Sequence, residues 1–228
     1  MSGKPLVLIG DGEFAEIAYE YFTHDSPHEV VAFAVERPFL TRSDLFGLPV
    51  VPLDELVARF PVATHGAFVA VTNTHLNRVR ARLMQATSSL GYDLVSYVST
   101  RAFVWHNVVV GSNCFVFENN VLQYHVVLED GVILWSGNHV GHRSRIRKHT
   151  FMTSHVVVSG YCDIGENCFL GVNASIADHT TIAHDCVIGM GAVITRGTEP
   201  GKVYVGNPGK PMEKSAYDTF KVPESDRP

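Results

Sequence analysis

Residues 162–194 read CDIGENCFLGVNASIADHTTIAHDCVIGMGAVI, and an isoleucine or leucine recurs there at every sixth position. The spacing extends back to residue 104, and a mostly small side chain lies two residues before each of its positions. The sixteen positions are all aliphatic or methionine: Val104, Val110, Val116, Leu122, Leu128, Leu134, Val140, Ile146, Met152, Val158, Ile164, Leu170, Ile176, Ile182, Ile188 and Ile194. A period of six fits neither an α-helix nor a lone strand. It predicts a β-solenoid in which each hexad forms one side of a triangular coil, with about five coils in all.

The four cysteines follow the same pattern. Cys114, Cys162, Cys168 and Cys186 each lie two residues before an aliphatic position, and no two of them have the C-x-x-C spacing. We therefore expect buried free thiols that behave as small hydrophobic side chains. Free thiols are typical of a reducing compartment rather than of a disulfide-linked secreted protein.

The first hundred residues predict a different kind of unit. Apolar runs at residues 6–9, 29–35 and 67–71 alternate with helical patterns, which is typical of a small parallel sheet. Six prolines lie in the first 61 residues, and none follows until Pro200, so the composition also changes along the chain. We expect three parts: an α/β domain at residues 1–95, the β-solenoid at 96–212 and a C-terminal tail at 213–228.

Composition and charge exclude several classes of protein. Hydrophobic residues make up 46% of the chain and charged residues 18%, which is enough apolar material for a core and excludes global disorder. The net charge of −5 provides no basic surface for nucleic acid or an anionic membrane. The apolar runs are too short for a membrane span or a signal peptide. We expect a cytoplasmic protein without nucleic-acid binding or membrane insertion.

Three segments, CFLGVNA at 168–174, IGMGAVI at 188–194 and VGNPGK at 205–210, together with the period of six, resemble the hexapeptide-repeat sugar O- and N-acetyltransferases. The subgroup that the chain resembles contains the sialic acid O-acetyltransferases and the bacillosamine-pathway N-acetyltransferases. The resemblance covers almost the whole chain. It implies a small Rossmann-like domain for a nucleotide-linked sugar, followed by a left-handed parallel β-helix of hexapeptide repeats.

The resemblance also implies the activity and the assembly. Such a protein is a homotrimer, and the pantetheine arm of acetyl-CoA runs between neighbouring β-helices. The expected function is acyl transfer from CoA, with acetyl-CoA as co-substrate and no metal, to the amine or hydroxyl of a sugar in surface polysaccharide biosynthesis.

His142 is the expected general base, since acyl transfer needs a group that takes the acceptor's proton. The family's catalytic histidine opens a His-(Asp/Glu)-Cys segment eighteen residues before a glycine, and here His142 and Gly160 have that spacing. Arg143 departs from the pattern, because it stands where the family often has a carboxylate and an arginine cannot accept a hydrogen bond. Asn138 and Glu118 are the alternative acceptors. Arg143 itself is either a ligand for a phosphate of substrate or CoA, or a solvated corner residue.

The remaining candidates are assigned by their position in the family. In the acyl-CoA site we expect Phe151, Gly160, Val172, Met190 and Lys210, with Gly160 offering its backbone N–H to the thioester or oxyanion. In the sugar-nucleotide site we expect Gly10, Asp11, Gly12, Glu13, Glu36, Asn73 and Arg78. The glycine loop before a helix lets the backbone approach a phosphate, and an acidic residue such as Glu36 would hold base or ribose hydroxyls. The alternatives are ordinary packing and a vestigial N-terminal domain.

Three other functions compete with this interpretation. A catalytically inactive CoA- or sugar-binding β-helix protein is favoured by Arg143, and CoA binding without turnover would identify it. A γ-carbonic-anhydrase-like zinc enzyme would need a third histidine 36 residues before His179, where Arg143 stands; His142 misses that register by one. An NAD-dependent reductase, suggested by Gly10 and Gly12, would need a second nucleotide-binding half.

Overall fold

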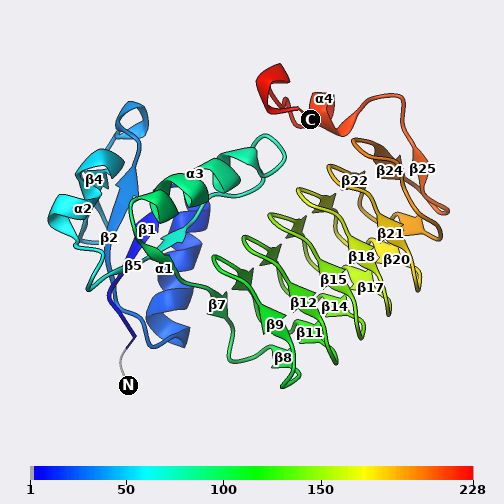
Figure 1. Ribbon diagram of the computed structural model, residues 1–228, viewed down its shortest axis with the longest axis horizontal. Coiled ribbons are helices and arrows are strands. Elements are labelled where there is room, and N and C mark those ends of the chain that lie inside the picture. Colours follow the sequence, from blue (N-terminus) through cyan, green and yellow to red (C-terminus); the bar gives the residue numbers. More distant parts are fainter. Residues whose placement is uncertain (1–2, 228) are drawn as a thin grey trace. The chain divides into compact units, whose positions relative to one another are not determined.

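The computed structural model describes residues 3–227 and divides into two compact units (Figure 1). One unit is formed by Met1–Thr72 and Arg80–Tyr97, and the other by Asn73–Val79 and Val98–Pro228. The segment Asn73–Val79 therefore belongs to the second unit, although it lies inside the region 1–95 that we expected to form one domain. Among the described residues, no helix has the length and apolar character needed to span a bilayer.

The N-terminal unit is built on a six-stranded sheet in the order β3-β4-β2-β1-β5-β6. Its strands are β1 (Leu6–Ile9), β2 (Val30–Val35), β3 (Asp44–Leu45), β4 (Leu48–Pro52), β5 (Gly66–Val69) and β6 (Asp93–Leu94). Its helices are α1 (Glu13–Asp25), α2 (Leu56–Arg59) and α3 (Arg78–Ser89), with short 3-10 turns at Arg37–Phe39 and Leu53–Glu55. All strand pairs are parallel except β3 with β4, so the predicted parallel sheet is confirmed.

Helix α1 follows the central strand directly and packs on the sheet through one apolar face. Phe14, Ala15, Ala18 and Phe22 are its buried residues, and their spacing places them on one side of a helix. Gly10 makes the tight connection possible. Its φ of +125° suits glycine alone, and a Cβ there would lie 2.8 Å from the carbonyl oxygen of Ala70.

The second unit is a parallel β-helix with three sheets, one along each side of the coil (Figure 1). The chain enters it through β7 (Tyr97–Val98). The first sheet contains β10 (Phe115–Val116), β13 (Ile133–Leu134), β16 (Phe151–Met152), β19 (Phe169–Leu170), β22 (Val187–Ile188), β24 (Val203–Val205) and β25 (Lys210–Pro211). The second contains β8 (Phe103–Val104), β11 (Val121–Leu122), β14 (His139–Val140), β17 (Val157–Val158), β20 (Ser175–Ile176) and β23 (Val193–Ile194). The third contains β9 (Val109–Val110), β12 (Val127–Leu128), β15 (Arg145–Ile146), β18 (Asp163–Ile164) and β21 (Thr181–Ile182).

The aliphatic series forms the interior of the coil, as the period of six predicts. Every one of its positions from Val116 to Ile194 is buried, and Val104 and Val110 pack against this core from the first coil. Residues eighteen apart are neighbours in adjacent coils, so that Leu122 pairs with Val140. The four cysteines are free and buried in the same core, which confirms that part of the prediction.

A left-handed backbone residue marks each corner of the coil from residue 113 onward. The residue three positions before each aliphatic position from Val116 to Ile194 has φ between 53° and 78°: Asn113, Asn119, His125, Gly131, Gly137, Arg143, His149, His155, Tyr161, Asn167, Asn173, His179, Asp185 and Gly191. Glycine, asparagine and aspartate tolerate this conformation best. Since a coil has eighteen residues, the series falls into three columns. We name them the His142 corner (residues 124–125, 142–143, 160–161 and 178–179), the Asp185 corner (residues 112–113, 130–131, 148–149, 166–167 and 184–185) and the Met190 corner (residues 118–119, 136–137, 154–155, 172–173 and 190–191).

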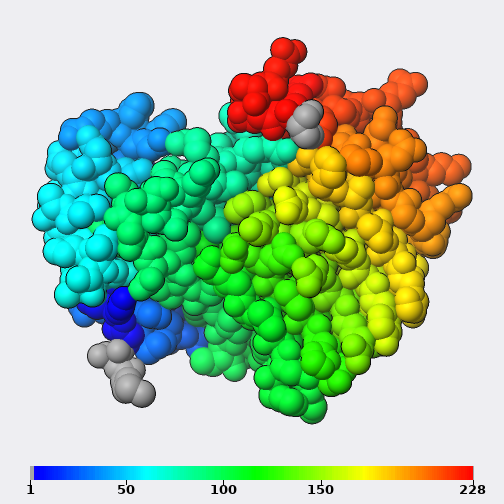
Figure 2. Space-filling view, in the orientation of Figure 1, coloured from blue at the N-terminus to red at the C-terminus, as the bar shows by residue number. Residues whose placement is uncertain are grey.

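The C-terminal segment packs on the β-helical unit rather than forming a separate tail. After the antiparallel pair β24–β25, the chain forms α4 (Ala216–Thr219), capped by the Ser215 hydroxyl, and a 3-10 turn at Glu224–Asp226. Ala216 and Val222 are buried in a small cluster with β-helix side chains. Figure 2 shows these red C-terminal residues lying against the yellow and orange late coils.

Candidate active site

The His142 corner places seven exposed side chains on successive coils, and the eighth residue of this column, Gly160, is buried. Backbone hydrogen bonds hold them in register: the N–H groups of Arg143, Tyr161 and His179 donate to the preceding coil at 2.8, 2.9 and 3.0 Å. Side chains at a corner point away from the packed interior. A column of functional groups therefore lies on the surface, with His142 in the middle of it.

The imidazole of His142 lies over Gly160 of the next coil. A Cβ on residue 160 would come within 2.5 Å of Cε1 and 2.8 Å of Nε2 of His142, so only glycine leaves room for the ring. Tyr161 contacts the ring edge to face, with centroids 5.1 Å apart. The backbone N–H of His142 donates to Oε1 of Gln123 at 3.0 Å. The imidazole is exposed and therefore within reach of an acceptor, which a general base requires.

The two alternative acceptors for the imidazole have other partners. Asn138 is completely buried, where its amide donates to the carbonyl of Trp135 and its Oδ1 accepts from the N–H of Val156. Glu118 accepts a hydrogen bond from the Ser136 hydroxyl at 2.6 Å. The structure therefore does not support either residue as the substitute for the missing carboxylate.

Aromatic and cationic side chains surround His142 at this corner. The guanidinium of Arg143 lies over the Tyr124 ring of the preceding coil, 5.3 Å from its centroid. On the following coil, Tyr161 stacks on His179 with centroids 4.8 Å apart and ring planes 7° apart. Motif comparison missed these rings, although the eighteen-residue spacing from His142 and Arg143 leads directly to Tyr124 and Tyr161.

The N–H of Gly160, expected to face the thioester, is hydrogen-bonded in this structure. It donates to Oδ1 of Asp178 at 2.7 Å. A thioester carbonyl would have to replace this carboxylate before the amide of Gly160 could stabilise an oxyanion. Asp178 is therefore a site residue that motif comparison missed, and it lies one coil beyond Gly160 in the same column.

The other expected acyl-CoA residues fall into two groups. Phe151 is buried, 4% exposed, and its ring stacks on Phe169 with centroids 5.8 Å apart, so its role here is packing and it offers no surface to CoA. Val172 and Met190 are 40% and 80% exposed and lie one above the other at the Met190 corner. Lys210 is exposed on β25. Val172 and Met190 thus lie at a different corner of the coil from His142.

The glycine loop of the N-terminal unit leaves the start of α1 open. Gly12 is the N-cap residue and provides no side-chain cap, and the exposed Glu13 is the first helical residue. The backbone N–H groups of this turn are suited to an anion. The guanidinium of Arg42 lies 3.6 Å from the carboxylate of Asp11 beside this loop. Arg42 follows no recognisable motif, and sequence reasoning missed it.

Glu36 already has a charged partner within the N-terminal unit. Its carboxylate forms two hydrogen bonds with the Arg82 guanidinium, both 2.8 Å, and these bonds hold the pKa of Glu36 below its ordinary value. A cavity of about 360 Å³ lies beside it, bordered by Arg37 and Asp54, which form an ion pair. Asn73, another expected sugar ligand, belongs to the β-helical unit.

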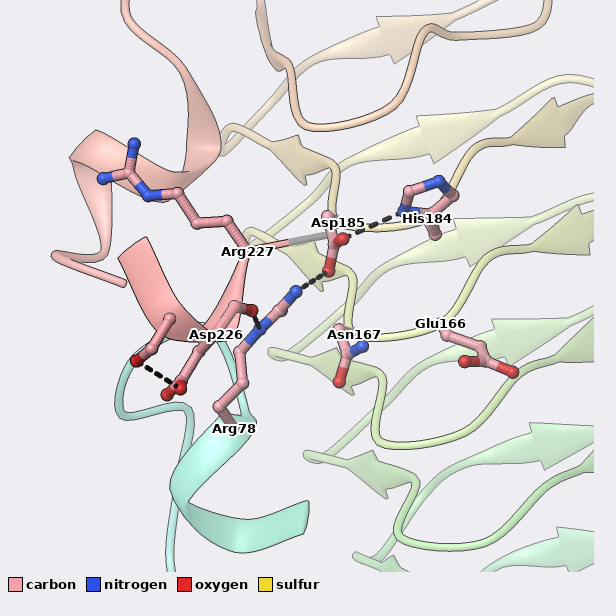
Figure 3. A pocket seen from close by; sticks show the side chains of 8 residues that line it. Arg78, Glu166, Asn167, His184, Asp185, Asp226 and Arg227 are labelled. Atoms are coloured by element: carbon pink, nitrogen blue, oxygen red, sulfur yellow. Dashed lines mark hydrogen bonds and ion pairs between the residues drawn. The ribbon is translucent and has the colours of Figure 1, made fainter. Parts of the chain in front are cut away.

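Arg78 also belongs to the β-helical unit, where it has a structural role. Its guanidinium forms an ion pair with Asp185 at 2.6 Å, and its Nε–H donates to the carbonyl oxygen of Asp226 (Figure 3). Asp185 is 3% exposed, accepts a hydrogen bond from the Tyr217 hydroxyl and contacts Nδ1 of His184, both at 2.9 Å. These contacts bind the C-terminal segment beside a cavity of about 400 Å³ and leave Arg78 unavailable to a sugar nucleotide.

No cluster of three or more histidine, cysteine, aspartate or glutamate side chains within residues 3–227 is arranged to hold a metal ion.

Comparison with known proteins identifies the architecture. Residues 161–196 match the family described as bacterial transferase hexapeptide (six repeats). A search of the curated proteins finds no match. Among solved structures, a histidine-to-asparagine mutant of perosamine N-acetyltransferase from Caulobacter crescentus, in complex with CoA and GDP-perosamine, has a TM-score of 0.83 at 26% identity. That alignment covers 92% of this chain and 97% of the other.

Two further structures are similar over the same span. The acetyltransferase domain of PglB from Neisseria gonorrhoeae FA1090 has a TM-score of 0.82 at 26% identity, covering 92% of this chain and all of that one. WeeI from Acinetobacter baumannii AYE, with a TM-score of 0.77 and coverage of 91% and 99%, is 19% identical and shows the fold alone. The resemblance to hexapeptide-repeat sugar acetyltransferases is confirmed, and the β-helix is the left-handed kind.

Proposed function

We propose that this chain transfers an acetyl group from acetyl-CoA to the amine or hydroxyl of a nucleotide-linked sugar, as part of surface polysaccharide biosynthesis. The observation that carries the proposal is the exposed imidazole of His142 above Gly160, at one corner of a hexapeptide β-helix. The similar protein from Caulobacter crescentus is a perosamine N-acetyltransferase crystallised with CoA and GDP-perosamine. A binding mode like that one would supply both substrates to this corner.

The reaction runs by direct transfer. His142 takes the proton from the acceptor nitrogen or oxygen as that atom attacks the thioester carbonyl carbon. The oxyanion accepts a hydrogen bond from the N–H of Gly160 once the carboxylate of Asp178 has released it. The tetrahedral intermediate then collapses, the carbon–sulfur bond breaks, and the imidazolium gives its proton to the leaving thiolate. A covalent acyl-cysteine is excluded for the four cysteines, because all of them are buried in the coil.

A homotrimer would complete the site. Val172 and Met190 lie at a different corner from His142, so a donor bound along them would reach the imidazole of a neighbouring copy and not that of its own chain. The large exposed fraction of Met190, 80%, is consistent with cover by a second β-helix. Sedimentation analysis should therefore give a mass three times the 25.1 kDa of the chain. The four free thiols support a cytoplasmic location.

The N-terminal unit would hold the nucleotide part of the acceptor. We infer a Rossmann-like role from its parallel sheet, the open start of α1 after Gly12, and the Arg42 guanidinium beside the loop. A diphosphate carries negative charge, and uncapped N–H groups together with an arginine favour such a group. Gly12 permits a close approach of such a group, because a Cβ there would point into open space.

The test measures donor binding and turnover on wild type and His142→Ala. Acetyl-CoA at a hundred times its Kd should stabilise both proteins by about 2.7 kcal/mol in thermal unfolding. With GDP-perosamine as acceptor, wild type should release CoA thiol, and His142→Ala should be slower by about 10² to 10⁴-fold. No thermal shift at millimolar acetyl-CoA would overturn the proposal. A shift without thiol release, for any nucleotide-linked amino sugar, would instead identify the inactive binding protein.

A further inference from the structure

Arg143 is a cation without a carboxylate partner beside His142. The two arginines that follow it in the same coil are paired, Arg145 with Glu129 at 3.0 Å and Arg147 with Asp163 at 2.6 Å. For the exposed Arg143, no carboxylate lies within ion-pair distance anywhere in residues 3–227, and the Tyr124 ring is the contact of its guanidinium. Its N–H groups are therefore available to an anion from outside the chain.

The backbone does not favour an arginine at this position. Arg143 has a φ of 58°, and seven of the fourteen corner residues are asparagine or glycine, which tolerate that conformation at least cost. The long side chain gains a contact with the Tyr124 ring and no ion pair within residues 3–227. Strained or unusual backbone positions cluster at functional sites, so the presence of an arginine at this position calls for a functional explanation.

The side chain of Arg143 extends to the side of His142 away from Gly160. Tyr124, over which the guanidinium lies, belongs to the coil before His142, and Gly160 belongs to the coil after it. If the thioester is bound at Gly160, the acceptor approaches the imidazole from the Tyr124 side. A phosphate held by Arg143 would then belong to the acceptor.

We propose that Arg143, which lies over the Tyr124 ring, binds the phosphate that joins the acceptor sugar to its nucleotide. This inference rests on the proposed function. The guanidinium fork matches a phosphate with two parallel hydrogen bonds, and the tyrosine ring beneath the cation adds a cation–π contact. In a nucleotide-linked sugar, a single pyranose ring separates this phosphate from the reacting group. Adjacent side chains, Arg143 and His142, suit that separation.

The test compares Arg143→Asn and Arg143→Lys with His149→Asn. Asparagine is the residue that four other corners use, so Arg143→Asn should fold as wild type does. His149→Asn introduces asparagine at a left-handed position of the Asp185 corner and is the control. With acetyl-CoA and GDP-perosamine, Arg143→Asn should raise the KM for GDP-perosamine by about tenfold to a hundredfold, as expected for the loss of charge-assisted hydrogen bonds. The KM for acetyl-CoA should stay within about twofold, and the lysine variant should recover part of the loss.

Three kinetic outcomes would overturn the inference. A rise in the KM for acetyl-CoA alone would assign the phosphate to CoA. Unchanged KM values in Arg143→Asn would make Arg143 a solvated corner residue. An equal change of the KM values in His149→Asn would lead to the same conclusion. Turnover of free perosamine, which has no phosphate, should be insensitive to Arg143→Asn. Calorimetry in the His142→Ala background measures GDP-perosamine binding without turnover. It therefore tests the Arg143 contact even if the proposed acetyl transfer fails. If Arg143→Asn in this background does not weaken the binding of GDP-perosamine, the contact is refuted.

Discussion

Gly160→Ala is the sharpest perturbation of the His142 site, because it adds one methyl group under the imidazole. The methyl carbon would lie 2.5 Å from Cε1 of His142, whereas ordinary contact begins at 3.4 Å, so the ring has to move by about 1 Å. A misplacement of about 1 Å in a catalytic group costs about a hundredfold in rate. We therefore expect kcat for acetyl transfer to fall by about two orders of magnitude.

Stability should not fall with activity in this variant. The three atoms nearest to the added methyl all belong to the exposed, mobile His142 side chain, and Gly160 does not have the left-handed backbone that penalises alanine. Alanine also restricts the unfolded chain, which stabilises a protein by about 0.4 to 1 kcal/mol at a compatible site. The thermal midpoint of Gly160→Ala should therefore equal or slightly exceed that of wild type.

Gly165→Ala provides the contrasting control, one coil side further along the chain. Its methyl would lie 2.5 Å from the backbone nitrogen of His184, and backbone cannot rotate aside. We expect this variant to lose about 1 to 3 kcal/mol of stability while its folded fraction keeps a normal kcat. Thermal unfolding and thiol-release kinetics, measured on both variants, distinguish a loss of kcat from a loss of stability. A wild-type kcat in Gly160→Ala would refute the placement of the working imidazole over residue 160.

Three further predictions concern the packing of the β-helical unit. Asp185→Asn keeps a residue type suited to a φ of 61° but removes the charged partner of Arg78. Urea unfolding should show that the free energy of unfolding falls by about 3 kcal/mol. An unchanged urea midpoint would contradict a stabilising role for the ion pair. Burial and the hydrogen bond to Asp185 raise the pKa of Tyr217 from 10.0 to about 12. The unfolded chain therefore releases this proton at a lower pH than the folded chain does, and stability should fall as pH rises from about 10 to about 12. Tyr217→Phe should lose that part of the pH dependence. Leu134→Ala, at a fully buried interior position, should cost about 2 to 5 kcal/mol, measured by the same urea titration, and a smaller loss would show that the coil collapses around the cavity.

The repeat of six predicted the interior of the β-helix well for a physical reason. Side chains that point into a narrow triangular coil have no access to water, so positions such as Leu134 and Ile164 must be aliphatic, and that requirement appears in the sequence. The eighteen-residue spacing of the family motif also placed His142 against Gly160, and the structure shows the two in contact.

Corner contacts were not predictable from the same period. Corner side chains face solvent, where many residue types are tolerated, so the spacing does not tell which groups meet. The hydrogen bond from Gly160 to Asp178 and the cation–π contact of Arg143 with Tyr124 depend on side-chain direction and reach. Phe151 was misassigned for a related reason, since its position in the hexad does not reveal that Phe169 covers it.

The end of the coil after β23 has a consequence for the behaviour of the protein at high concentration. A parallel β-helix presents three strand edges at each end, and bare edges invite end-to-end stacking into fibres. At the C-terminal end, β25 places Lys210 and Pro211 along the first sheet, and a charge and a proline are poor partners for a further strand. Gly209 donates to Val193 on the second sheet, and Thr198 donates to Thr181 on the third. Truncating the chain after Ile194 should therefore turn a dispersed protein into one that polymerises.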